Sequence, residues 1–395
     1  MNPATQSPRS AGEFRLTDGQ VAKDPGEYFE ELRTQCPVAH SESFDGFWVL
    51  SRHEDVNGAA LKDQEFSSAS GITIPVINQP PVICIGQDDP EHRKYRRPLQ
   101  GWFSAKRVNA LEDQVRSIVT ECLDGEVEKG EGDLSALLAS PVPPIVIALI
   151  LGLPREDWDW FRERETEMLT CSQRGDAEGA LKAVMDVHGY LGKELELRRQ
   201  TPAEDMLTDI VQLEIDGEPI TQENAVSLAF LILGAGHETT VGGIGGLLYQ
   251  VAKDPALRDE LLADPSLVDN AVEEALRLEA PLMGLGRNTR NEVEVDGVSI
   301  PAGEWVMLLF GAANRDPEVF DDPESFRLDR ENVQEHLAFG AGVHRCVGAP
   351  LARLEMKVVL EEVLRRMPRV QLVDPEAVEV RWTVGRDFQG LHATW

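Results

Sequence analysis

The feature that most constrains this chain is a glycine-rich loop around one cysteine, at residues 339–348 (FGAGVHRCVG). Apolar residues recur at helical spacing from Leu351 to Met367, so the pattern predicts a helix directly after the loop. Pro350 suits the first turn of that helix, where no backbone N–H is needed. Cys346 therefore precedes a helix N-terminus, which favours an anion and lowers the pKa of a thiol. A thiolate is the form that binds metal, and the glycines let the backbone approach a bulky group closely.

Length and composition favour a large, well-packed protein with an acidic surface. The chain has 395 residues, of which 42% are hydrophobic, enough for one large domain or two smaller ones. Its 38 Lys and Arg residues are outnumbered by 69 Asp and Glu residues, which gives a net charge of −31. Nucleic acid and an anionic membrane are poor partners for such a charge, so we expect neither.

Cysteine spacing and the apolar runs indicate the compartment. The five cysteines follow neither a zinc nor a disulfide spacing, which favours a reducing, intracellular environment. The most apolar run, residues 144–153, is too short to span a membrane. Residues 1–19 are largely polar, and we expect them to form a flexible tail before a domain at residues 20–395. These features together predict a cytoplasmic protein, and we expect a monomer.

The cysteine loop resembles the haem-binding signature of the cytochromes P450, Phe-Gly-x-Gly-x-His-x-Cys-x-Gly, with every fixed position filled. The resemblance implies that Cys346 is the axial metal ligand of haem b and that Phe339, His344 and Gly348 contact the haem. It also implies a mainly α fold with a minor β region, a single large domain with haem between a long glycine-bearing helix and the helix after the loop. From the residues alone, the alternative is a buried free cysteine in a turn, which we expect for Cys36, Cys84, Cys122 and Cys171.

A second informative stretch is the long apolar helical pattern at residues 227–249. Gly234 and Gly236 lie in its middle, where each glycine costs roughly 1 kcal/mol, so we expect a helix that is opened or bent there. Glu238 and Thr239 are costly in apolar surroundings unless their polar groups are satisfied. A groove for helix packing with a surface glutamate is the alternative.

The segment Ala235-Gly236-His237-Glu238-Thr239 resembles the oxygen-binding groove of the same family. The resemblance implies that small residues make room for dioxygen beside the haem at Ala235. It implies that Glu238 and Thr239 are catalytic and supply protons, a task that suits a carboxylate able to reload from solvent. His237 fills a variable position, and we expect it to face outward or to form a structural hydrogen bond rather than to bind metal.

Basic side chains in two further segments suit an anionic ligand. His92 and Arg96 are four residues apart and share one face of a helix, which on its own indicates a solvated surface. Beside the cysteine loop, the pair resembles the family's His-x-x-x-Arg, which binds the haem propionates through cation–carboxylate pairing. Arg287 matches a third cation of that kind.

Glu274 and Arg277 lie three residues apart in an apolar helix at residues 270–278. An exposed pair of this kind would contribute under about 1 kcal/mol. The family's Glu-x-x-Arg pair is instead buried and binds a further arginine, for which Arg327 and Arg330 are both candidates. We expect a structural role for this cluster.

The remaining patterns place short elements around these motifs. We expect helices at residues 25–33 and 54–61, a strand at 47–50, a hairpin around Asp296-Gly297 and a closing strand pair at 378–395 with Phe388 at its turn. Residues 71–87 form a long loop that is rich in Ile, Val and Pro. Such a loop is expected to cover an apolar cavity, the alternative being simple burial against the core.

The substrate pocket is expected to be apolar and without charge. Its candidate residues come from the apolar loop, the long helix and the late strands: Ile72, Ile74, Ile83, Ile85, Leu231, Gly234, Met283, Leu285 and Phe388. Because only Phe388 is aromatic, we expect a small, neutral, compact aliphatic substrate such as a terpenoid. The layout looks similar to bacterial monoterpene hydroxylases, while polyketides and steroids stay open.

The resemblance covers essentially the whole chain and implies insertion of one oxygen atom from O2 into a C–H bond. Electrons are expected to come from a separate ferredoxin and ferredoxin reductase. A basic patch is expected to bind the acidic ferredoxin: Arg96, Arg97, Lys106, Arg107, Arg345, Arg353 and Lys357. Two alternatives are a peroxide-driven hydroxylase of the same fold, against which Glu238 and Thr239 argue, and a haem sensor or electron carrier.

Overall fold

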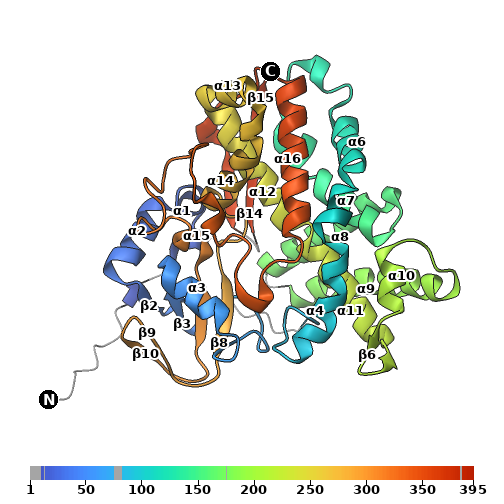
Figure 1. The fold of residues 1–395 in the computed structure, drawn as a ribbon, viewed down its shortest axis with the longest axis vertical. Helices are drawn as coiled ribbons and strands as arrows, with labels where there is room; N and C mark the ends of the chain where they lie inside the picture. Colours follow the sequence, from blue (N-terminus) through green and yellow to red (C-terminus); the bar gives the residue numbers. More distant parts are fainter. Residues whose placement is uncertain (1–9, 13, 75–81, 175, 383–384) are drawn as a thin grey trace.

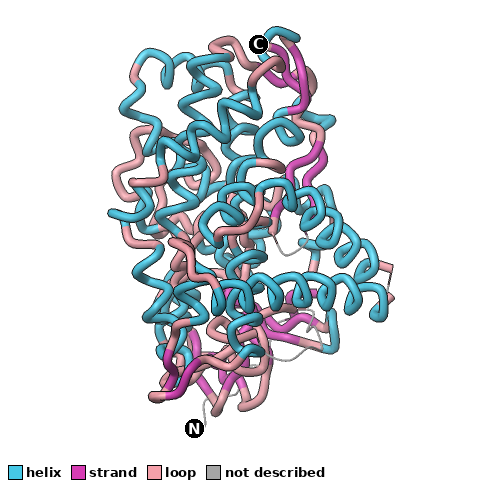
Figure 2. Tube along the Cα trace, turned by 90° about the vertical axis from the view of Figure 1, so that its right-hand side faces the viewer, coloured by secondary structure: helices cyan, strands magenta, loops and turns pink. Residues whose placement is uncertain are grey.

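The computed structural model describes residues 10–12, 14–74, 82–174, 176–382 and 385–395. Helices make up most of the molecule (Figure 1). The strands gather mainly at the end that holds the N-terminus, and a second group lies towards the C-terminus (Figure 2). The predicted mainly α fold with a minor β region is confirmed.

A mixed sheet joins the early and late parts of the chain. Within the described residues it has six strands in the order β1-β2-β3-β11-β8-β4. Their bounds are Ser10–Gly12, Val38–Ser41, Phe47–Leu50, Trp305–Leu308, Leu285–Thr289 and Phe66–Ser67. β11 pairs parallel with β3, with Val306 opposite Trp48, and antiparallel with β8. The strand predicted at residues 47–50 is therefore confirmed, and it is buried along its whole length, as is usual for a central strand.

The N-terminal segment belongs to the folded body from residue 10 onward. β1 pairs with β2, and the side chains of Phe14 and Leu16 are buried. The Phe14 ring lies edge-on to Phe47, with the ring centroids 5.2 Å apart. The flexible tail predicted for residues 1–19 is therefore wrong for the described residues after 9, because apolar side chains in this polar stretch find a cluster to join. Residues 1–9 and 13 lie outside the described part of the chain.

Short helices pack around the sheet. They are α1 (Gly19–Lys23), α2 (Gly26–Gln35), α3 (His53–Leu61) and α15 (Phe310–Ala313). The predicted helices at 25–33 and 54–61 correspond to α2 and α3. α3 and α15 lie side by side, and this places the C-terminal end of α3 next to the cysteine loop.

The helical part of the molecule surrounds one large apolar core. Its helices are α4 (Glu91–Trp102), α5 (Ala105–Asn109), α6 (Glu112–Leu123), α7 (Val142–Leu151), α8 (Trp158–Gln173), α9 (Ala177–Gln200), α10 (Met206–Val211), α11 (Gln222–Ala235), α12 (Glu238–Lys253), α13 (Pro255–Ala263), α14 (Val268–Leu278) and α16 (Ala349–Arg366). α12 lies near the middle in Figure 1 and packs against α14, α16 and β14. Fully buried residues such as Val119, Leu247 and Val359 fill the space between these helices.

The long apolar pattern at residues 227–249 forms two helices rather than one. α11 ends at Ala235 and α12 begins at Glu238, so the predicted opening of the helix is confirmed. A Cβ on Gly236 would lie 2.8 Å from Cδ1 of Ile147, which explains why α7 can pack so closely here. By length and composition, residues 222–253 are the one stretch of the described chain that could cross a membrane, with a mean hydropathy of 1.2. Its most apolar window is 39% buried, and the stretch is broken into two helices that pack against α9, α14 and α16, so this single stretch is weak evidence for a membrane span.

Small strand pairs complete the fold. They are β9 (Val293–Val295) with β10 (Val298–Ile300), β13 (Glu379–Trp382) with β14 (Arg386–Gln389), β6 (Glu214–Ile215) with β7 (Glu218–Pro219), and β15 (His392–Thr394) between β5 (Glu131–Asp133) and β12 (Gln371–Leu372). The hairpin predicted at Asp296-Gly297 is confirmed, with φ of 48° and 74°. Phe388 lies inside β14 opposite Val380, so its prediction at the turn is wrong. The last strand pairs with β5 and β12 rather than folding back onto β14.

Candidate functional site

The cysteine loop is closed by its own backbone. The N–H of Cys346 donates to the carbonyl oxygen of Phe339 at 2.8 Å. Gly340 and Gly342 have φ of 65° and 68°, which only glycine adopts without strain. A Cβ on Gly342 would lie 2.5 Å from the carbonyl oxygen of Ala60 in α3, so this glycine also lets the loop rest on that helix. The loop therefore has a single shape that is set by local and distant contacts.

Cys346 lies directly before the N-terminus of α16, as the sequence predicts. Gly348 is the N-cap residue, and Pro350 is in the first turn. Burial raises the pKa of the Cys346 thiol, while the N–H groups of Gly348 and Ala349 act in the opposite direction. The helix N-terminus thus lowers the pKa of the Cys346 thiol, as predicted, but burial raises this pKa by more. Cys346 nevertheless keeps accessible surface, so a ligand can reach it.

His92, Arg96, Arg287 and His344, called the basic cluster below, come together from three separate segments. The rings of His92 and His344 have centroids 4.3 Å apart, and Arg96 donates from Nη2 to the carbonyl oxygen of Arg345. Burial, followed by repulsion from Arg287 and His92, lowers the pKa of His344 to about 3. Burial also lowers the pKa of Arg287 to about 10. All four predicted residues therefore lie within electrostatic reach of one another.

In the described residues Arg96, Arg287 and His344 form no ion pair with a carboxylate, whereas Nδ1 of His92 lies 3.4 Å from Oδ1 of Asp89. Nε of Arg96 and Nε2 of His344 are buried without a hydrogen-bond partner in the described part of the chain. Arg287 donates Nη1 to the carbonyl oxygen of Gly286 at 2.8 Å, and no described carboxylate forms an ion pair with it. Buried donors of this kind carry a large desolvation cost unless an anion pairs with them. The cluster fits a bound dicarboxylate, and the nearby thiol fits a metal inside the same ligand, which together describe haem.

The junction of α11 and α12 places small residues beside polar ones. Thr239 donates Oγ1–H to the carbonyl oxygen of Ala235 at 2.9 Å. Glu238 is the first residue of α12 and is half-buried. Gly234 and Ala235 are exposed, and a Cβ on Gly234 would meet no atom within 4 Å. This side of the junction therefore opens onto free space, as a groove for a small molecule requires.

A small, mainly apolar cavity of about 80 Å³ lies between α7, α8, α9 and α11. Gly234 and His237 line it, and His237 is half-buried there. The aromatic side chains of Trp158, Phe161 and Phe230 also line this cavity. Sequence analysis missed these residues, although the aromatic run at residues 158–161 was a usable signal. They lie here because α9 packs along both α8 and α11.

The predicted pocket residues separate into groups. Ile83 and Leu231 pack together on the large core, and the Ile83 N–H lies 3.3 Å from Oγ of Ser227 on α11. Ile72 accepts the N–H of Gly286 at 2.7 Å, which places it, Ile74 and Leu285 beside β8. Ile85 is half-buried in the loop before α4. The structure therefore brings the apolar loop next to both α11 and β8; residues 75–81 of that loop lie outside the described residues.

Met283 and Phe388 lie in packed clusters instead. Met283 is buried with Phe29 and Met307 beneath the sheet. Phe388 is buried against Tyr249, with ring centroids 5.5 Å apart, and against the glycines at 245 and 246 of α12. Their predicted contact with substrate is not supported, because both side chains are packed against neighbouring helices and strands.

The predicted Glu274–Arg277 pair is fully buried. Arg277 donates Nε and Nη2 to the two carboxylate oxygens of Glu274, both at 2.8 Å. Arg330 also donates Nε to Glu274, at 3.0 Å, whereas the side chain of Arg327 pairs with Asp329. Arg330 is therefore the third member of the cluster, and its structural arrangement agrees with the prediction.

A second buried ion cluster was missed. Glu273 accepts from Arg353 at 2.8 Å and lies 3.0 Å from Nε2 of His336. Burial raises the pKa of Glu273, but these partners outweigh it and hold the pKa at about 2.

Lys357, another member of the predicted basic patch, pairs with Asp269 at 2.8 Å. The basic patch predicted for a ferredoxin is therefore smaller, because Arg96, Arg353 and Lys357 are already engaged. Arg107 is exposed but pairs with Asp209 at 4.0 Å. The exposed members that remain, called the docking patch below, are Arg97, Lys106 and Arg345.

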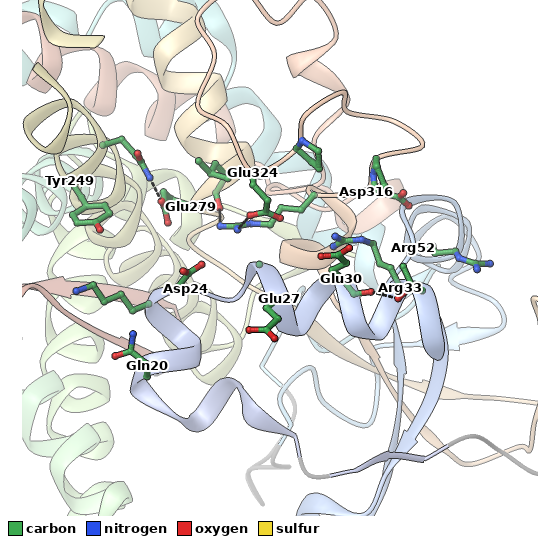
Figure 3. Close-up of a pocket in the computed structure, with 18 of the residues that line it drawn as sticks. Gln20, Asp24, Glu27, Glu30, Arg33, Arg52, Tyr249, Glu279, Asp316 and Glu324 are labelled. Carbon is green, nitrogen blue, oxygen red and sulfur yellow. Dashed lines mark hydrogen bonds and ion pairs between the residues drawn. The ribbon is translucent and has the colours of Figure 1, made fainter. Parts of the chain in front are cut away.

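A larger, polar cavity of about 870 Å³ lies apart from the cysteine loop (Figure 3). Asp24, Glu27 and Glu30 line one wall, and Glu279 and Glu324 lie on the opposite side. Glu279 is buried and binds Arg386 and Gln250. The cavity includes none of the residues predicted to function.

Comparison with known proteins agrees with this geometry. The Cytochrome P450 family model matches residues 172–379. Cytochrome P450 130 of Mycobacterium tuberculosis is 34% identical over 391 residues, covering 94% of this chain and 95% of that protein. Mycinamicin IV hydroxylase/epoxidase of Micromonospora griseorubida is 35% identical over 373 residues, covering 92% of each chain. The structure of cytochrome P450 CYP109Q5 from Chondromyces apiculatus has a TM-score of 0.85 and 32% identity, covering 96% of this chain and 97% of that one. The chain belongs to the cytochrome P450 family of haem-thiolate oxidoreductases.

Proposed function

We propose that this protein inserts one oxygen atom from O2 into a C–H bond of a small, neutral, apolar organic molecule. The observation that carries the proposal is the basic cluster, in which Nε of Arg96 and Nε2 of His344 are buried without a partner in the described residues, beside an accessible cysteine at a helix N-terminus. Cys346 would hold the haem iron, and the basic cluster would hold the two propionates. Phe339, Gly348 and Ala235 would contact the macrocycle. When bound, haem supplies the iron centre at which dioxygen is activated.

Glu238 and Thr239 would deliver protons to that centre. The Thr239 hydroxyl already donates to Ala235, so its lone pairs stay available to accept a hydrogen bond from water or bound oxygen. Glu238 is half-buried and can exchange protons with solvent, as a general acid requires. The helix break supports this role, because Gly234, just before it, borders free space on the same junction.

At about 80 Å³ the small apolar cavity is too small for a whole terpenoid, polyketide or steroid, so it would take only part of the substrate. Its aromatic lining favours a substrate with a flat or unsaturated part over the compact aliphatic one expected from Phe388 alone. Relatives are named for work on mycinamicin, pentalenic acid and steroids. Terpenoids, including monoterpenes, therefore stay within the proposed class together with polyketides and steroids. Screening such compounds for the low-spin to high-spin shift of the haem spectrum, followed by product analysis, tests this point.

Electrons would come from an acidic ferredoxin, with its reductase, in the cytoplasm. The docking patch lies on neighbouring elements, because α5 packs beside both α4 and α16. Opposite charges at such an interface mainly raise the association rate. Arg97→Glu with Lys106→Glu should slow reduction by ferredoxin and weaken its salt dependence, whereas Lys193→Glu on α9 should not. Equal rates in all three proteins would count against the patch.

Two measurements separate this function from its alternatives. Cys346→Ala or Cys346→His should abolish the thiolate-type spectrum of the reduced carbon-monoxide complex, while Cys122→Ser should keep it. A haem sensor or electron carrier would show no product with ferredoxin, reductase and any compound that shifts the spin state. A peroxide-driven hydroxylase would turn over with hydrogen peroxide alone at the full rate.

A further inference from the structure

A buried carboxylate, Asp88, stands beside the basic cluster. It is 7% exposed and precedes α4, and its backbone oxygen accepts the N–H of His92 at 3.0 Å. Its negative charge opposes the fall in pKa of both Arg287 and His344. Asp88 therefore lies close enough to act on the same side chains that would hold the propionates.

Asp88 is held by groups from the end of the sheet. Ser68 donates its N–H to Oδ1 at 2.8 Å, and the Ser67 hydroxyl donates to Oδ2. Arg290 donates Nη2 to Oδ2 at 2.5 Å. Burial raises the pKa of Asp88, but these hydrogen bonds outweigh burial, so the carboxylate stays ionised. Of these partners, only Arg290 brings a positive charge.

The topology fixes this contact. Ser67 in β4 lies opposite Asn288 in β8, and Arg290 directly follows β8. The N–H of Arg290 donates to the carbonyl oxygen of Glu65 at 2.9 Å, which ties the two strands together just beyond their paired residues. Arg287 lies within β8, so this strand and the residue directly after it provide both the cation for the ligand and the cation for Asp88.

A fixed negative charge at this place works against the ligand. Two propionates would have to bind next to an ionised carboxylate, and like charges repel strongly where water is scarce. We propose that Arg290 is a positioning residue that offsets the charge of Asp88, so that the basic cluster can hold two propionates beside it. The Arg290 side chain is 42% exposed, so it acts from the solvent side through Asp88.

Haem release measures this effect without substrate or electron donor, so its outcome is independent of the reaction proposed above. The haem-loaded protein is mixed with excess apomyoglobin, and the transfer of haem is followed by absorbance. Arg290→Gln should release haem about tenfold faster. This factor corresponds to a loss of about 1.4 kcal/mol in haem binding when the charge of Asp88 is no longer offset. Arg290→Lys should release haem at close to the wild-type rate, since it restores the charge. The matched control is Arg52→Gln, because Arg52 is 41% exposed and pairs with Asp296 at 3.0 Å away from the basic cluster.

A double variant separates charge from structure. If Arg290 acts by offsetting Asp88, then Asp88→Asn in the Arg290→Gln protein should bring haem release back towards the wild-type rate. If the arginine only braces the strands, the double variant should release haem at least as fast as Arg290→Gln, and the proposal is overturned. It is also overturned if Arg290→Gln behaves like Arg52→Gln.

Discussion

The imidazole rings of His92 and His344 lie with their centroids 4.3 Å apart, one carried by α4 and the other by the turn before Cys346. Burial lowers the pKa of both, so near pH 7 two neutral rings meet rather than two cations. Nε2 of His344 is buried without a partner in the described chain, which leaves it available for a propionate.

His344→Phe keeps a ring at this place but removes the donor. We expect the variant to fold and to lose haem roughly tenfold faster, in line with one lost hydrogen bond to a charged group. Transfer of haem to apomyoglobin measures the rate. His40→Phe is the control, because His40 also makes a ring contact, with Trp48, but lies in the sheet away from the basic cluster. Unchanged retention in His344→Phe would remove His344 from the propionate site.

Proton delivery predicts a selective loss of turnover. Thr239→Ala and Glu238→Gln should each lower the rate of product formation about 100-fold, a typical contribution of acid catalysis. The spin-state shift on substrate binding should persist, because neither change alters the apolar cavity. Thr240→Ala removes the adjacent, buried hydroxyl and should leave turnover close to normal. Equal losses at Thr239 and Thr240 would point to helix damage rather than to proton delivery.

The Glu274 cluster predicts that substitution of Arg330 lowers stability strongly, whereas substitution of the nearby Arg327 does not. Arg330→Gln should lower the free energy of unfolding by about 3 kcal/mol, because it leaves part of a buried carboxylate uncompensated. Arg327→Gln should leave stability nearly unchanged, since its side chain pairs with Asp329 at the surface. Urea unfolding of both variants tests this prediction. A comparable loss of unfolding free energy in both variants would mean that Arg330 does not specifically stabilise the Glu274 cluster.

Asp55 predicts a pH dependence with a definite sign. Burial, and next the charge of Asp296, raise its pKa from 3.8 to about 6. Between these values the folded state holds more protons than the unfolded state, so this carboxyl lowers stability as the pH rises and its full penalty is present above about pH 6. After allowance for solvent screening, Asp55→Asn should stabilise the protein by about 1–2 kcal/mol at pH 7 and hardly at all at pH 4. Urea unfolding of Asp55→Asn and of the wild-type protein at the two pH values measures this difference.

Local motifs were predictable because their information lies within a few residues. The order of glycines, His344, Cys346 and Pro350 is enough to specify a loop, a thiol and the start of a helix. The break near Gly236 was predictable for the same reason, since two glycines weaken one turn of a helix. Burial of Glu274 was implied by the family resemblance, since the residues alone also allowed an exposed pair.

Features that depend on distant segments were not predictable. The sequence around Arg353 does not show that Arg353 will form an ion pair with Glu273, because the two residues meet only after α14 packs on α16. The aromatic cavity requires α8 to lie against α9 and α11. Phe388 was assigned to the pocket for its size, but β14 places it against α12, where glycines leave room for the ring.

The parallel pairing of β3 with β11 has a consequence for the chain as it is being made. Residues 47–50 leave the ribosome early, whereas residues 305–308 emerge only after most of the protein has been synthesised. During that interval β3 lacks its pairing partner β11, and the cysteine loop that rests on Ala60 has not yet been synthesised. Long-range pairing of this kind is slow and keeps apolar strand edges open to wrong partners. The haem site is therefore complete only after the cysteine loop has been synthesised and has packed on Ala60.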